Sequence, residues 1–284
     1  MLFHRYAATI LAALILNTPA AHAATSANDD CLSSASIPQK VAAAPFLVFG
    51  DVHGTAEVPR FIASYLCAAS RNARLLTLAM EIPASEQPGI DTYLASAGKS
   101  DDLARFVSSP FWQRSRQDGR TSIAMLHLFE QIRAMRASGT QIRIVAIDDT
   151  QAADRNVAMA ARIKAELTRS TGHQLVVLIG GLHAIRSKRT QSKFQSSIYL
   201  LADEHPLSLI VGTAGGTAWV CKSGDPASCN ATNWDINRVN PAPESAITLT
   251  PPSEQFDGVF FVGQTTASPP AIAVIKTPFA AEQQ

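Results

Sequence analysis

The sequence predicts an α/β fold: a mainly parallel β-sheet flanked by helices on both faces, with a C-terminal antiparallel extension. Short, continuously apolar runs of strand length alternate with segments whose apolar residues recur at helical spacing. A strand that is apolar on both sides is typical of a parallel sheet covered by crossover helices. After about residue 215 the composition changes, because glycine, proline, serine and asparagine become more frequent. The extension is predicted from that change.

Each element follows from its local pattern. The five apolar runs predicted to be strands are 46–49, 75–80, 142–147, 175–179 and 207–211, and the predicted helices are 57–70, 121–137 and 156–167. Thr121 or Ser122, and Asp154, are the expected N-caps, since their side-chain oxygens accept from the first free N–H groups of a helix.

Two regions lack this alternation. Residues 98–120 have no strand character and are predicted to form a loop or short helices folded over something, with Phe111 and Trp112 as packing residues that also could cover a pocket. In the extension, the segments GTAWV, GVFFVG and AIAVI are predicted to be extended, as antiparallel strands added at a sheet edge.

The start of the chain is typical of a secretory signal peptide. Arg5 precedes an apolar run, 7–16, that is too short to span a bilayer comfortably, and Ala21-His22-Ala23 fits the small-x-small cleavage rule. No cysteine stands where a lipid-attachment box needs one, so we expect a periplasmic or secreted protein. The expected divisions are a signal peptide at 1–23, a loose arm at 24–44, a main α/β domain at 45–215 and a β extension at 216–284 packed on the same domain.

Charge and hydropathy exclude several partners. The 24 lysines and arginines nearly balance the 23 aspartates and glutamates, which argues against nucleic acid or an anionic membrane as the main partner. No apolar run after the leader is long enough to span a membrane. A small molecule or a peptide is the expected partner, and the oligomeric state is left open.

Four cysteines remain after the leader, an even number in an oxidising setting, which favours disulfides over free thiols. Three pairings are possible. The stretch CKSGDPASC is rich in turn-forming residues, which favours Cys221–Cys229 together with Cys31–Cys67.

Acids and histidines gather where the predicted strands end. In an open parallel sheet, ligands bind beyond the carboxyl ends of the strands. The residues that follow the first four strands are Asp51, His53 and Glu57; then Glu81; then Asp148 and Asp149, with Arg155 close behind; and then His183. His53 and His183 each end a G-x-x-H sequence, in which the glycine permits a sharp turn. We therefore predict a site at this rim.

Plainer roles compete for several of these residues. Asp51 could cap a turn, His53 could bond a carbonyl, and one of Asp148 and Asp149 is expected to cap a loop. Glu81 should be partly buried, where an unpaired carboxylate is costly, so Arg155 or a histidine is its expected partner. The histidines expected to lie outside the site are His127, His173 and His205.

The segment GDVHG resembles the opening motif of calcineurin-like metallophosphoesterases. Their two-metal centre needs further ligands from three later motifs, G-D-x-x-D, G-N-H-[DE] and G-H-x-H. The third strand here ends AIDDTQ, GGLHA lacks both the asparagine and the acid, and no G-H-x-H follows. The ligand count fails, so this function is disfavoured.

A second resemblance fits the order of the motifs. The chain has Gly50-Asp51-Val52-His53-Gly54, Met80-Glu81, Arg155-Asn156-Val157-Ala158-Met159-Ala160 and Gly180-Gly181-Leu182-His183. This order resembles the haem-binding-uptake and Tiki superfamily, which includes ChaN-like haem-binding proteins, Tiki/TraB-like metalloproteases and erythromycin-esterase-like hydrolases. The resemblance spans about residues 45–215. Asp51 stands where many members have glutamate, and the cysteine-bearing tail lies largely outside the match.

The resemblance implies that His53 and His183 face each other across a pocket, surrounded by Asp51, Glu57, Glu81 and Arg155. It leaves three mechanisms open. In a metal-free hydrolase, His53 is the general base, Asp51 or Glu57 orients it, and Arg155 or His183 stabilises the oxyanion. In a metal-assisted hydrolase, His53, His183 and Glu81 bind one divalent ion.

The third mechanism is a haem binder without catalysis, in which a histidine or a tyrosine binds the iron. The candidate tyrosines are Tyr65, Tyr93 and Tyr199. Haem needs a broad apolar slot, whereas this rim is dense in acids and carries an arginine. A hydrolase of the esterase or metalloprotease kind is therefore favoured.

Overall fold

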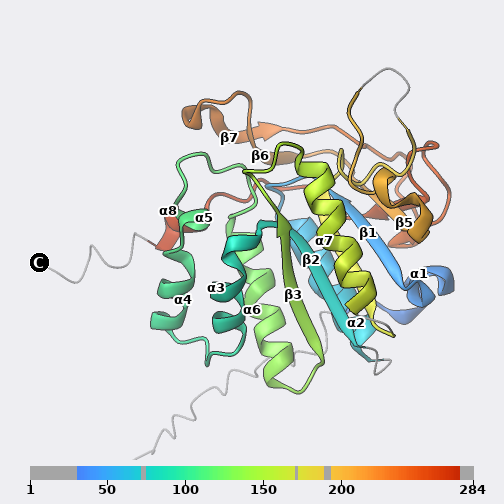
Figure 1. The fold of residues 1–284 in the computed structure, drawn as a ribbon. Helices are drawn as coiled ribbons and strands as arrows, with labels where there is room; N and C mark the ends of the chain where they lie inside the picture. The colour runs from blue at the N-terminus through green and yellow to red at the C-terminus, as the bar shows by residue number, and fades with distance from the viewer. Residues whose placement is uncertain (1–30, 72–74, 170–171, 189–192, 276–284) are drawn as a thin grey trace, which may run out of the picture.

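The protein is described by a computed structural model that covers residues 31–71, 75–169, 172–188 and 193–275 (Figure 1). The expected signal peptide and the first part of the expected arm lie outside these residues. A seven-stranded sheet of order β3-β2-β4-β1-β5-β9-β8 forms the centre of the molecule. Its strands are β1 Phe46–Asp51, β2 Leu76–Pro83, β3 Ile142–Asp148, β4 Gln174–Gly180, β5 Leu207–Gly212, β8 Ile247–Thr248 and β9 Gly258–Phe261.

The sheet is parallel except at one edge. β1 pairs in parallel with both β4 and β5, β2 pairs in parallel with β3 and β4, and β9 continues the parallel order beyond β5. Only the pairing of β8 with β9 is antiparallel among the described strands of this sheet. The prediction of a mainly parallel sheet is confirmed, and the five predicted strands all form.

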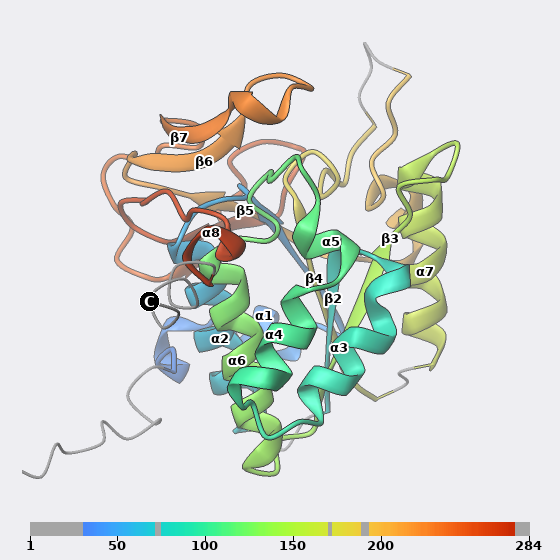
Figure 2. The ribbon, with the colours of Figure 1, turned by 90° about the vertical axis from the view of Figure 1, so that its left-hand side faces the viewer.

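Helices cover both faces of the sheet, and alternate residues of β1 show this division. Phe49 packs on one face, with its ring centroid 5.2 Å from that of Tyr65 in α2. Phe46 packs in the separate apolar cluster of the other face. Figure 2 shows α7 on one side and α3, α4 and α6 on the other. The helices are α1 Gln39–Ala43, α2 Glu57–Ser70, α3 Gln87–Leu94, α4 Ser100–Val107, α5 Pro110–Gln113, α6 Ile123–Ala137, α7 Arg155–Arg169 and α8 Ala271–Ile275.

The predicted N-caps form and place two helix starts at the rim of the sheet. Ser122 Oγ accepts from the Met125 N–H at 3.3 Å, so α6 begins at Ile123. Asp154 Oδ1 accepts from the N–H groups of Asn156 and Val157 at 2.8 and 3.2 Å. Capping fixes the first turn of α7 just beyond the end of β3.

The segment 98–120 consists of α4, α5 and a loop that we call the arginine loop, residues 114–120. Trp112 is 2% exposed and packs against Phe106 and Phe129, with ring centroids 5.3 and 6.1 Å away. Its expected packing role is confirmed. Burial of each such ring contributes about 1.5–3 kcal/mol, which anchors the loop that follows.

The extension differs from its prediction in two ways. β6 Thr217–Cys221 and β7 Cys229–Asn233 form a separate antiparallel hairpin, which lies above the carboxyl ends of the main strands, whereas β9 joins the main sheet in parallel. The segment AIAVI is helix α8 rather than a strand. Pro269 and Pro270 precede it; proline lacks the N–H that a strand ladder needs but is tolerated in the first turn of a helix.

Both predicted disulfides, Cys31–Cys67 and Cys221–Cys229, are present, and the described residues contain no free cysteine. The first joins the start of the described chain to α2, and the second crosslinks the two strands of the hairpin. In the part of the chain that the structure describes, no helix has both the length and the apolar character needed to cross a membrane. The remaining short 3₁₀ segments are η1 Ser34–Ser36, η2 Ala84–Glu86, η3 Tyr199–Glu204 and η4 Pro226–Ser228.

Candidate functional site

The carboxyl ends of four neighbouring strands bring the predicted acids and histidines together. Asp51 ends β1, Asp148 ends β3, and Glu81 lies near the end of β2. The pairing of β2 with β3 shifts register between Met80 and Pro83. Such an irregularity re-aims a side chain, and here it occurs at Glu81, which is 6% exposed. The site is therefore built at the rim that the sequence predicted.

Glu81 is the centre of the cluster. Its Oε1 lies 3.1 Å from Arg120 Nη1 and 3.0 Å from Arg155 Nη2. Its Oε2 accepts from the backbone N–H of Gly180 at 2.9 Å and lies 3.3 Å from His53 Nε2. Burial by itself raises the pKa of this carboxyl, but the charge and hydrogen bond of His53 and the charge of Arg120 outweigh it and hold the pKa well below its usual range. The expected pairing of Glu81 with Arg155 or a histidine is confirmed, with both kinds of partner.

His53 has a carboxylate at each ring nitrogen. Its Nδ1 lies 2.9 Å from Asp51 Oδ2, and its Nε2 faces Glu81 as above. A ring nitrogen donates a proton to an ionised carboxylate oxygen at this range, so this geometry favours the doubly protonated imidazolium. Burial alone lowers the pKa of His53, but the charges and hydrogen bonds of Glu81 and Asp51 raise it to about 10. At neutral pH His53 is therefore a cation without a free lone pair.

His183 is in the opposite state. Its Nδ1 lies 2.6 Å from Asn156 Oδ1, which also accepts from the Ser197 hydroxyl at 3.0 Å. The Nδ1 atom therefore donates, and Nε2 keeps its lone pair, 3.9 Å from Glu81 Oε1. Burial lowers the pKa of His183; Glu81 opposes this, while Arg155 and His53 add to it. At neutral pH His183 is a neutral imidazole.

Two guanidinium groups join Glu81 to Asp148. Arg155 donates through Nε to Asp148 Oδ1 at 2.9 Å and through Nη2 to Asp148 Oδ2 at 2.6 Å. Arg120 Nη1 also lies 3.1 Å from Asp148 Oδ2. Charge-assisted pairs of this kind are short and rigid, so the floor of the site is held in one arrangement. Asp149, by contrast, accepts from the Gln151 N–H in the following loop, as expected of a loop cap.

Sequence reasoning missed Arg120 and Asp118, because it examined strand ends and these residues lie in the arginine loop. Asp118 Oδ2 accepts from Arg120 Nη2 at 2.8 Å, and the charges of Arg120 and Arg114 overcome the effect of burial to depress the pKa of Asp118. One feature of the sequence pointed towards these two residues. Residues 98–120 lack strand character and were predicted to fold over another part of the molecule.

Glu57 is the predicted site residue that the structure places elsewhere. It begins α2, and its carboxylate accepts from the Thr266 N–H at 2.8 Å. The neighbouring Ala56 N–H donates to the Thr266 carbonyl at 2.9 Å. The chain has already turned into the helix at this point, so Glu57 fastens α2 to the C-terminal segment and does not join the cluster around Glu81. Glu57 is not among the residues that line the cavity next to this cluster.

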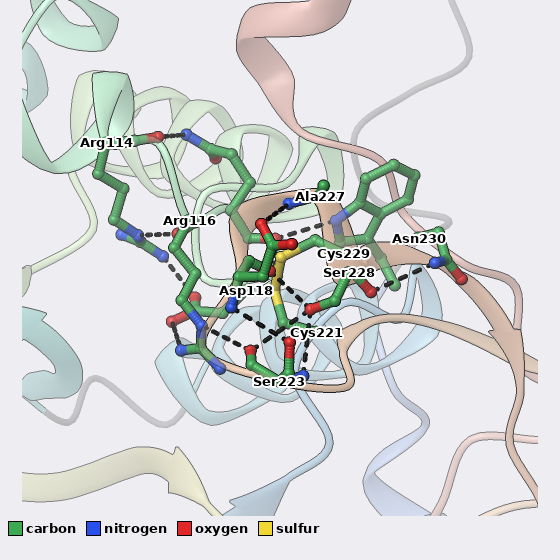
Figure 3. Close-up of a disulfide and its surroundings, with 12 residues drawn as sticks. Arg114, Arg116, Asp118, Cys221, Ser223, Ala227, Ser228, Cys229 and Asn230 are labelled. Carbon is green, nitrogen blue, oxygen red and sulfur yellow. Dashed lines mark hydrogen bonds and ion pairs between the residues drawn. A yellow bond between two sulfur atoms is a disulfide. The ribbon is translucent and has the colours of Figure 1, made fainter.

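The cluster forms the floor of a cavity of about 650 Å³, a volume within the usual range for small-molecule sites. The charged residues that line it are Asp51, His53, Glu81, Arg116, Asp118, Arg120 and Arg155, and the apolar residues include Leu182, Ile210, Val220, Trp234, Ile236 and Phe256. One side of the cavity is supplied by the extension. Figure 3 shows the Cys221–Cys229 disulfide beside Arg116 and Asp118 of the arginine loop.

The predicted metal set, His53, His183 and Glu81, does not fit a divalent cation. Both oxygens of Glu81 already accept from cationic or N–H donors, and His53 carries protons on both nitrogens in this arrangement. Two guanidinium groups beside the carboxylate would also repel an added cation. Within the described residues, no group of three or more histidine, cysteine, aspartate or glutamate side chains has the geometry of a metal site.

The predicted haem ligands fit no better. Tyr65 and Tyr93 are buried in the apolar cluster that α2 and α3 share with the sheet, and Tyr199 belongs to η3. None of these three tyrosines lines the cavity. Of the proposed axial ligands, only His183 presents a free nitrogen there.

Comparison with known proteins places the fold. No protein-family model matches the sequence, and no curated protein matches it significantly. Among solved structures, an erythromycin esterase in its open conformation superposes with a TM-score of 0.58 at 11% identity, covering 80% of this chain and 93% of that one.

Two further structures are similar to about the same degree. A succinoglycan biosynthesis protein has a TM-score of 0.53 at 11% identity, and a Bacillus cereus protein has a TM-score of 0.51 at 10% identity. Each covers 81% of this chain and 91% of its own. The predicted erythromycin-esterase-like resemblance is confirmed at the level of fold: this chain shares its α/β architecture with an erythromycin esterase.

Proposed function

We propose that this protein is an exported hydrolase that cleaves a carbonyl ester or amide by direct attack of water, with His183 as general base and His53 as a fixed imidazolium. The observation that carries the proposal is that two histidines face one carboxylate, Glu81, with different second partners, a carboxylate of Asp51 for His53 and an amide oxygen of Asn156 for His183. A general base and a cation beside the same cavity are what water attack on a carbonyl requires. Two disulfides support an oxidising location.

The chemistry follows from the two ring nitrogens. A water molecule gives a proton to His183 Nε2 as its oxygen forms a bond to the carbonyl carbon. The carbonyl oxygen becomes an oxyanion, which the charges of His53 and Arg155 stabilise. When the bond to the leaving group breaks, His183 returns the proton to the leaving oxygen or nitrogen, and the site regains its starting state.

Asn156 and Asp51 hold the two rings in these roles. Asn156 accepts from His183 Nδ1 and so leaves the lone pair on Nε2 of a residue that lines the cavity. Asp51 accepts from His53 Nδ1 and so keeps the second ring protonated. The metal-free mechanism considered from the sequence had His53 as the general base. In this proposal the general base is His183 instead.

The test is turnover of a panel of p-nitrophenyl esters and chromogenic peptides. His183→Gln is expected to lower kcat/KM about 10²–10⁴-fold, and His53→Gln about 10²–10³-fold. The matched control is His127→Gln, since His127 is exposed on α6 and lies outside the cavity. Exhaustive chelation of divalent ions is expected to leave kcat/KM unchanged.

The pH profile separates the two histidines. Activity needs neutral His183, so kcat/KM should rise with pH through a pKa below the ordinary 6.5. Activity also needs protonated His53, so kcat/KM should fall again near pH 10. If the acidic limb persisted in His183→Gln and vanished in His53→Gln, the roles would be reversed. Unchanged turnover in both variants would refute the hydrolase proposal.

A further inference from the structure

The extension supplies an uncharged wall to the cavity. The residues of the extension that line it are Val220, Cys221, Trp234, Ile236, Asn237 and Phe256, together with Gln255. None of these side chains carries a charge, in contrast to the floor around Glu81. Leu182 and Ile210 of the main domain line the same cavity. These residues together form a wall that is uncharged and largely apolar, so a ligand that fills this space meets this wall and a charged floor.

Two side chains at this wall are unusually exposed for their size. Leu182 is 61% exposed and Ile236 is 52% exposed. Five large apolar side chains are exposed in the described part of the chain, and two of the five border this one cavity. Isolated exposed apolar residues need no explanation, but apolar surface gathered at a concave site marks ligand binding.

The wall is held in place before any ligand binds. Trp219 of β6 donates from its indole to the Gln117 carbonyl at 2.9 Å and from its backbone to the Gly54 carbonyl at 2.9 Å. The backbone N–H of Trp234 donates to the Gly216 carbonyl at 2.8 Å. The Cys221–Cys229 disulfide then crosslinks the hairpin beside the arginine loop (Figure 3). A preformed wall loses little ordering entropy when a ligand binds.

We propose that this wall binds an aliphatic acyl group of the substrate, so that the hydrolase prefers acyl esters or amides with a hydrocarbon chain. The inference rests on the proposed function, because the floor must receive the carbonyl carbon that the acyl chain carries. An uncharged chain suits a wall without charged side chains, since a charged group would lose its hydration there without gaining a partner.

Binding without turnover is the first test. The probes are N-methyl alkanamides of four to ten carbons, whose amide bond is slow to hydrolyse, measured by titration calorimetry on the intact protein. Affinity is expected to rise about two- to fourfold with each added methylene until the wall is covered. Ile236→Ser and Leu182→Ser should each flatten this rise. The matched control is Leu75→Ser, because Leu75 is 40% exposed at the opposite end of the sheet.

Turnover of p-nitrophenyl acetate, butyrate and octanoate is the second test. The ratio of kcat/KM for octanoate to that for acetate should fall in Ile236→Ser and stay constant in Leu75→Ser. Chain-dependent binding without any turnover would support the wall and refute the proposed hydrolase. Turnover or binding that does not depend on chain length, or a rise that persists in both Ile236→Ser and Leu182→Ser, would overturn the acyl-group inference.

Discussion

Gly180 shows how a single residue without a side chain permits the central contact of the site. Its N–H donates to Glu81 Oε2 at 2.9 Å. A Cβ added here would lie 3.2 Å from His53 Nε2 and 3.3 Å from Glu81 Oε2. Gly180 is not one of the glycines whose φ is positive. A glycine is therefore needed here for space and not for its backbone conformation. Gly180 therefore leaves the space in which His53 and Glu81 come close enough to stabilise the imidazolium.

Gly180→Ala is accordingly expected to push His53 away from Glu81 while leaving the fold intact. The pKa of His53 should fall below about 10, because the imidazolium loses part of the attraction that stabilises it. Imidazole ¹⁵N chemical shifts followed against pH measure this value. Gly89→Ala is the control, since nothing lies within 4 Å of a Cβ added there. A His53 pKa unchanged in Gly180→Ala would contradict the account.

At the scale of elements, the hairpin of β6 and β7 supports the arginine loop. Trp219 bonds Gln117, the Cys221 sulfur lies 3.5 Å from the Gln117 carbonyl oxygen, and Arg116 Nε donates to the Ser223 carbonyl at 3.4 Å. The loop in turn positions Arg120 beside Glu81. The extension thus contributes to the floor of the site through a loop that lies about a hundred residues earlier in the chain.

Removal of the Cys221–Cys229 disulfide, by serine at both positions, is therefore expected to loosen the arginine loop. Amides of residues 114–120 should exchange hydrogen several-fold faster, because a less constrained hairpin holds Gln117 less often. Hydrogen exchange followed by mass spectrometry measures this. The paired control replaces Cys31 and Cys67 by serine, which should lower global stability by about 2–4 kcal/mol without a selective effect on this loop. Equal exchange in both variants would refute the coupling.

At the scale of the whole molecule, His53 links stability to pH. Its pKa is about 10 in the folded protein and 6.5 for an ordinary histidine. The stabilising contribution is fully present below pH 6.5, where both folded and unfolded chains hold the proton. Between these values only the folded chain holds it, so the free energy of unfolding falls as pH rises. The slope for one proton is at most about 1.4 kcal/mol per pH unit.

The expected result is a stability difference between the wild type and His53→Gln that is largest at pH 6 and shrinks towards pH 10. Urea unfolding at each pH measures the difference, and the other titrating groups, common to both proteins, largely cancel. His127→Gln should show a difference that does not change with pH. A gap that widened as the pH rose would mean that His53 is neutral in the folded protein.

The local sequence was sufficient for the five strands and the three long helices of the α/β part and for the rim, but not for the extension. Continuous apolar runs such as Phe46–Phe49 lie in the sheet because their side chains are apolar on both sides of the strand and can be buried on both faces. Asp154 and Ser122 cap helices through contacts within three residues. The order of the motifs also brought Asp51, His53, Glu81, Arg155 and His183 to one site, because parallel strands all end at the same edge.

Contacts between residues far apart in the sequence could not be predicted from local patterns. The pairing of Arg120 with Glu81 joins residues 39 apart, and the bond between Trp219 and Gln117 joins residues 102 apart. Neither leaves a local pattern. The protonation states of His53 and His183 likewise depend on which atoms meet in space. Two histidines in the same G-x-x-H sequence differ in charge, because a pair of carboxylates faces the cationic ring of His53 and an amide oxygen faces the neutral ring of His183. Residue types and strand order are properties of the chain, whereas charge state and cavity shape arise from packing between distant segments.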